Sequence, residues 1–314
     1  MSSLLELIEK LRQTEEAIAQ TETTFVESRS AAVALSLDSL KRWRNELEAQ
    51  FEQASKSQQV DVCRYRLFDP AGDNPAVRVV AGALRDFQEL VTTVYEALKS
   101  GPKQRVTTNA EARTVTSLNF AYTFAGSLGV VLTIPNEQLL LGSTPLDEAV
   151  EQVFSLLQAN DSGTIRKKAQ TLGPAAVRLA YEWAKVQAEA GVGSEVEWRH
   201  GPTVRSHVLL QRQEVQRLEE IIAQTSDTTE DRVPMRGRLV GIDTKSRTFH
   251  FEYSGEDLRG RLADTVTFET TVELPAIYDV VVLQRKVMAL ATGQETITYV
   301  LESLKPLSTE GRQS

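Results

Sequence analysis

The stretch that decides the fold opens the chain: residues 4–25 are LLELIEKLRQTEEAIAQTETTF, and residues 33–54 are VALSLDSLKRWRNELEAQFEQA. Apolar side chains recur in both pieces at steps of three and four residues, and no glycine or proline occurs before Pro70. This heptad spacing places the apolar side chains on one stripe of a helix. The stripe consists of Leu4, Ile8, Leu11, Ile18, Phe25, Val33, Leu37, Leu40, Leu47 and Phe51. Residues 1–60 are therefore predicted to form a long heptad helix or a helical hairpin.

The apolar stripe requires a partner surface, because a ridge of this length is not stable in water. One continuous helix of about 55 residues would be roughly 80 Å long. The two pieces are one residue out of phase, so a bend near residues 21–30 is the alternative. Glu15, Glu22 and Arg44 interrupt the stripe, and we expect them either to loosen the pairing or to specify its register. The partner is either the body of the same chain or a second copy, and we expect a homo-oligomer formed through the stripe.

Residues 61–225 alternate strand and helix patterns, which predicts a mixed α/β middle domain. Strand patterns cover residues 62–67, 114–124 and 128–134, and residues 195–200 and 203–210 flank a Gly201-Pro202 turn as a hairpin. Helix patterns run from 74 to 100, 144 to 157, 165 to 172, 175 to 190 and 211 to 225. The polar stretch 225–231 has no apolar anchor, so we place a domain boundary there.

Residues 234–307 carry almost only strand patterns, which predicts a small β-barrel, SH3-like or OB-like in size. The strands are expected at 235–243, 248–253, 258–262, 266–274, 278–287 and 295–303. The fold class is therefore α+β with several domains: an N-terminal helical segment, an α/β middle domain and an all-β barrel.

Composition excludes several classes of protein. The chain of 314 residues is 41% apolar and 25% charged, which is typical of a globular protein rather than a disordered chain. Its 35 basic and 43 acidic residues give a net charge of −8, and no segment is a basic block. The single Cys63 forms no internal disulfide, and its strand context predicts a buried thiol. The start has no signal-peptide pattern, and no apolar run is long enough for a membrane span, so we expect a cytoplasmic protein without membrane contact.

No phosphate-binding, dinucleotide-binding, zinc-protease or calcium-loop motif occurs in the sequence, and we expect no cofactor. Ala125-Gly126-Ser127-Leu128-Gly129 resembles a nucleophile elbow, but a β-rich run follows it where an elbow requires a helix. The region around Ser127 is therefore predicted to be a hairpin turn.

Two groups of residues are candidates for a binding or metal site. In the barrel, Arg236, Arg238, Arg259 and Arg261 form two pairs at strand spacing, which predicts a face that binds nucleic acid or a nucleotide. Two observations oppose this prediction. Acidic residues in the same stretch cancel most of the positive charge, and strand alternation points Phe249 and Phe251 into the barrel core rather than toward a ligand. His200 and His207 flank the Gly201-Pro202 turn as metal-ligand candidates, although the alternation of the strand turns Glu197 away from His200.

Three functions are compatible with these patterns. The favoured one is a non-enzymatic interaction or regulatory protein of the bacterial cytosol, which self-associates through its N-terminal helix and presents its other domains to a protein partner. The alternative is a nucleic-acid-binding or nucleotide-binding protein that acts through the barrel. The third is a metal-assisted hydrolase that uses His200 and His207.

Overall fold

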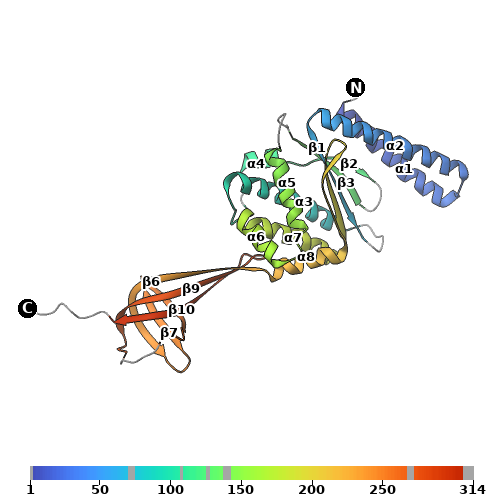
Figure 1. Cartoon of the computed structure of the whole chain (residues 1–314). Coiled ribbons are helices and arrows are strands. Elements are labelled where there is room, and N and C mark those ends of the chain that lie inside the picture. The colour runs from blue at the N-terminus through green and yellow to red at the C-terminus, as the bar shows by residue number, and fades with distance from the viewer. Residues whose placement is uncertain are drawn as a thin grey trace, which may run out of the picture. The chain divides into compact units, whose positions relative to one another are not determined.

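The computed structural model describes residues 3–69, 75–106, 109–124, 128–136, 143–266 and 272–306. The chain divides into two compact units (Figure 1). The first consists of residues 1–225 with 290–292, and the second of residues 226–289 with 293–314. The first unit contains both the N-terminal helical segment and the α/β region, because the two pack on one sheet.

The first unit is built on an antiparallel sheet with the strand order β2-β3-β1-β4-β5. Its strands are β1 (Val60–Phe68), β2 (Asn119–Phe124), β3 (Leu128–Pro135), β4 (Gly193–His200) and β5 (Thr203–Leu210). The predicted β4–β5 hairpin is present, and Gly201 at its turn has a φ of +56°, which favours glycine. Central β1 pairs with β3 along one edge and with β4 along the other.

Helices cover one face of this sheet. They are α3 (Val77–Ser100), α4 (Ala110–Val115), α5 (Pro145–Leu157), α6 (Ser162–Leu172), α7 (Pro174–Ala190) and α8 (Arg212–Gln224). Tyr65 of β1 marks this face: its ring lies 5.5 Å from that of Phe87 in α3, and its hydroxyl accepts a 2.9 Å hydrogen bond from the Trp183 indole in α7. Cys63, on the same face of β1, is buried as predicted, and burial raises the pKa of its thiol.

The N-terminal segment is a helical hairpin of α1 (Leu4–Ser28) and α2 (Ala31–Ser57). The chain turns at Arg29, whose left-handed φ of 46° ends α1 inside the predicted bend region. Figure 1 shows the hairpin on the side of the sheet away from α3 and α7. Its base packs on β1, β2 and β3 through a cluster of Leu7, Leu11, Leu47, Phe51, Val62, Ala121, Tyr122 and Val131.

The strand predicted at 114–124 is partly wrong, because residues 110–115 form α4 and β2 begins only at Asn119. The Asn109 side chain accepts a hydrogen bond from the Ala112 backbone N–H and so starts a helix. The buried Thr116 hydroxyl then bonds Thr92 of α3 at 2.7 Å, which holds the chain away from the sheet. The threonine-rich sequence is typical of a strand, but local capping and this long-range contact decide otherwise.

The second unit contains a closed five-stranded barrel with the order β10-β8-β7-β6-β9. Its strands are β6 (Ser226–Asp243), β7 (Thr248–Tyr253), β8 (Glu256–Leu262), β9 (Ala276–Ala289) and β10 (Glu295–Pro306). Phe249 and Phe251 are buried in the barrel core with Leu239, Val282 and Leu301, as alternation predicted. β6 begins at Ser226 rather than at the predicted position 235, because its polar first half pairs with the extended end of β9. The strand expected at 266–274 falls mostly on residues outside the described part of the chain.

Candidate binding face on the barrel

The outer face of β7 and β8 brings four polar side chains into two rows. In the antiparallel register, Thr248 stands opposite Arg261, and His250 stands opposite Arg259. All four alternate with residues that point into the barrel, so they share its outer face. β6 extends both rows, with Asp243 beside Thr248 and Gly241 beside His250.

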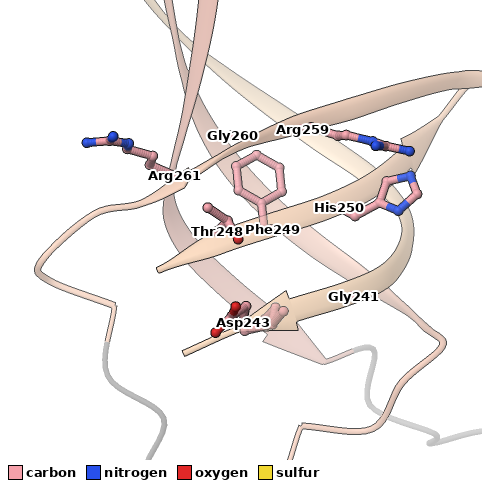
Figure 2. A pocket seen from close by; sticks show the side chains of 9 residues that line it. Gly241, Asp243, Thr248, Phe249, His250, Arg259, Gly260 and Arg261 are labelled. Carbon is pink, nitrogen blue, oxygen red and sulfur yellow. The ribbon is translucent and has the colours of Figure 1, made fainter. Parts of the chain in front are cut away.

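This face contains a hollow of about 700 Å³ (Figure 2). Figure 2 shows the Arg259 guanidinium beside the His250 ring, with Arg261 at the other end of the hollow. The space beside Gly241 is open, because a Cβ on this residue would meet only the Cβ of His250, at 3.9 Å. A larger side chain at position 241 would extend into the hollow. The lining residues are Gly241, Ile242, Asp243, Thr248, Phe249, His250, Arg259, Gly260 and Arg261.

The two carboxylates near the hollow are already engaged. Asp257 lies 3.0 Å from Nε2 of His250 and 3.7 Å from Arg259, and its interaction with His250 lowers the pKa of the carboxyl group. Asp243 accepts hydrogen bonds from Ser246 and from the backbone N–H of Lys245, which lower its pKa. Arg261, by contrast, has no carboxylate partner within the described ranges of the chain. Counting the described residues alone, the hollow has one cation without a carboxylate partner, Arg261, and a second, Arg259, that lies 3.7 Å from Asp257.

The structure does not bring all four predicted arginines together. Arg236 forms a two-pronged ion pair with Asp279 of β9, at 2.6 and 3.0 Å, and lines a different hollow between β6, β9 and β10. Arg238 lies 3.7 Å from Glu252. Only Arg259 and Arg261 share the β7–β8 face. Strand alternation already indicated that His250 lies on the polar side of its strand, but only the β7–β8 register places it beside Arg259.

The chain itself covers part of the N-terminal stripe, and a second copy that covers the rest stays a prediction. Four residues of the stripe are buried, Leu11, Ile18, Leu47 and Phe51, and Leu7 beside them is buried as well. The other predicted interface residues, Leu4, Ile8, Phe25, Val33, Leu37 and Leu40, are half-buried. The charged seam residues pair across the hairpin, with Glu22 2.8 Å from Lys41 and Glu15 3.8 Å from Arg44. These charges therefore set the register of an internal pairing.

His200 and His207 bind different carboxylates. Nδ1 of His200 lies 2.7 Å from Asp61, and Nε2 of His207 lies 3.0 Å from Glu195. His207 stands opposite Glu197, three residues before His200 on β4, so the two histidines are separated by about 10 Å along the strand. Within the described residues, no group of three or more potential ligands is arranged to hold a metal ion. Ser127 lies outside those residues.

No family model, curated protein or solved structure matches this chain. Among the helices of the described residues, none combines the length and apolar character that crossing a membrane requires. The candidate sites are therefore argued from their geometry.

Proposed function

We propose that the protein binds single-stranded nucleic acid through the outer face of β7 and β8, and that its barrel is of the OB type. The strand order supports this proposal. β10 lies between β8 and β9 and runs parallel to β8, which gives a Greek-key order rather than a simple up-and-down order. In OB barrels, the face of the second and third strands and the loop between the first two bind oligonucleotides. The second and third strands here are β7 and β8.

The single observation that carries the proposal is Arg261 in the hollow beside Arg259, where no carboxylate of the described residues pairs with it. A phosphodiester supplies the anion that this side chain lacks, and the Thr248 hydroxyl and His250 ring add hydrogen-bonding groups on the same face. Arg247 lies at the β6–β7 turn, where OB loops contact nucleic acid, but its guanidinium is already engaged by the Ala263 carbonyl oxygen and lies 3.7 Å from Asp264. The absence of an overall basic charge and the small number of arginine contacts predict weak binding with a modest dependence on salt.

Fluorescence anisotropy with a labelled single-stranded oligonucleotide tests this proposal. Each phosphate contact contributes about −0.7 to the slope of log affinity against log salt, so two arginine contacts give about −1.4. Affinity should then fall roughly sevenfold between about 50 and 200 mM salt. Arg261→Ala should weaken binding and reduce the slope by about 0.7.

Arg236→Ala is the matched control, because Arg236 is an equally exposed strand arginine whose charge is neutralised by Asp279. It should leave both affinity and slope unchanged. Absence of binding at low salt, or equal losses in the Arg236 and Arg261 variants, would refute the β7–β8 face as the binding site.

Self-association remains a second candidate function, and one observation favours it. The tip of the α1–α2 hairpin exposes Val26 by 74% and Leu35 by 70%, while Phe25, Val33 and Leu37 beside them are only half-buried. A second copy of the tip would cover these side chains. Light scattering at about 100 μM should then show a dimer that Val26→Ser with Leu35→Ser converts to a monomer; a monomeric wild-type protein would exclude this function.

A further inference from the structure

A carboxylate and a histidine meet at the end of the sheet in the first unit, where β1 begins and β4 ends. Asp61 is completely buried, and its Oδ1 lies 2.7 Å from Nδ1 of His200. Its Oδ2 accepts hydrogen bonds from the Trp198 indole N–H at 3.0 Å and from the Asn136 side-chain amide at 2.7 Å. Both carboxylate oxygens are therefore held, and the orientation of Asp61 is fixed.

Asn136, which donates to Asp61, is itself held by further hydrogen bonds. The second amide hydrogen of Asn136 goes to Asp147 at 3.0 Å, and its oxygen accepts a bond from the Thr144 hydroxyl at 2.9 Å. Burial opposes the charge on Asp147, but the Thr144 backbone N–H and the Arg205 guanidinium donate to this carboxylate, and its pKa is lowered. The network connects β1, β3, β4, β5 and α5, which makes the position of Asp61 rigid.

The two nitrogens of His200 have different surroundings. Because a carboxylate only accepts hydrogen bonds, Nδ1 carries the proton in the contact with Asp61. Nε2 then presents a lone pair. This nitrogen makes no hydrogen bond or ion pair in the described part of the chain. It is not among the buried polar atoms that lack a partner, and the histidine side chain is 12% exposed, so Nε2 is accessible to solvent. A base oriented by a buried carboxylate and open to solvent is the arrangement of a general base and its positioning residue.

A lysine side chain, Lys56, lies against the turn that directly follows this histidine. A Cβ on Gly201 would come within 2.7 Å of Cβ and 3.2 Å of Cδ of Lys56, so the lysine stem runs against the turn that directly follows His200. No ion pair engages Lys56 in the ranges that the structure describes. A neighbouring lysine without an acidic partner favours a substrate with a negative charge.

We propose that Asp61 and His200 form a hydrolytic site for an ester that carries an anionic group, independently of nucleic-acid binding by the barrel. Water is the first proton donor that an exposed base meets. Nε2 takes a proton from water, and the water oxygen attacks the ester carbonyl carbon. The bond from that carbon to the alcohol oxygen breaks, and the imidazolium returns its proton to the departing oxygen. Asp61 stays ionised throughout and holds the Nδ1–H group.

Hydrolysis of mono-p-nitrophenyl succinate, an anionic ester, and of p-nitrophenyl acetate, a neutral one, tests this proposal on the full-length protein. We expect faster turnover of the succinate ester, and Lys56→Gln should remove that preference. His200→Gln should lower kcat at least tenfold. His207→Gln is the matched control, because this second histidine of the hairpin also contacts a carboxylate yet lies outside the network, and it should retain full activity.

Asp61 acts through His200, so its variants are measured by kcat and KM separately. Asp61→Asn should lower kcat with little change in KM, and Asp61→Glu should restore part of the loss. If Asp61→Asn does not fold, His200→Gln and Trp198→Phe, checked by circular dichroism, provide the test. No hydrolysis of either ester by the folded wild-type protein, or equal activity of the His200 and His207 variants, would overturn the proposal.

Discussion

Leu11 provides the sharpest test of whether the N-terminal stripe is covered by its own chain. Its side chain is fully buried among Leu7, Leu47 and Phe51 at the base of the hairpin. Leu11→Ala removes this apolar contact and leaves a cavity, and such substitutions cost about 3 kcal/mol in well-packed cores. For a unit of this size, that loss lowers the Tm by roughly 6–12 °C.

The matched control is Leu5→Ala, which makes the same chemical change at a position that is 78% exposed on α1. It should change the free energy of unfolding by no more than about 0.5 kcal/mol. Urea unfolding followed by circular dichroism measures both variants at protein concentrations of about 1 and 100 μM, with Val26→Ser and Leu35→Ser added to every protein so that the hairpin tip causes no concentration dependence.

The two concentrations separate internal from intermolecular burial. If the chain itself covers Leu11, the unfolding midpoint is the same at both concentrations. If a second copy covered it, mass action would add up to about 2.7 kcal/mol over a hundredfold change. A midpoint that rises with concentration, or a cost of Leu11→Ala below about 1 kcal/mol, would refute the internal packing.

Three further predictions concern the first unit. Tyr65→Phe should destabilise it by about 1–3 kcal/mol in denaturant titrations, because the buried Trp183 N–H loses its acceptor; an unchanged midpoint would contradict the contact. Cys63 should react with a thiol reagent only as the protein unfolds, since burial excludes the reagent and raises the thiol pKa; rapid labelling of the native state would contradict this. Asp147 has a lowered pKa in the folded state, so its stabilising effect is complete above the ordinary value of about 3.9 and is lost as the pH falls through the lower folded value. Asp147→Asn should therefore flatten the curve of stability against pH below about pH 4, measured by urea titration, and an identical curve in the variant would exclude this role.

Local sequence patterns were sufficient for much of the architecture. The heptad spacing predicted either one long helix over residues 4–54 or a hairpin that bends near residues 21–30, and the chain turns at Arg29. Glycine and proline marked the β4–β5 turn, and strand alternation predicted that Phe249 and Phe251 enter the barrel core. These features depend on neighbours within a few residues, which is the range over which helix and strand periodicity act.

Pairing between distant segments was decided only by the tertiary structure. Periodicity defined the apolar stripe but carried no information about the surface that covers it, and that surface is partly supplied by β2 and β3, more than 60 residues further along the chain. Alternation put the barrel arginines on outer faces, yet strand register decided that Arg236 meets Asp279 while Arg261 meets no carboxylate in the described residues. Asp61 and His200 are 139 residues apart, and they face each other because β1 and β4 are neighbours in register. A single sequence records which side chains share a face, whereas contacts across strands follow from the order and register in which the strands assemble.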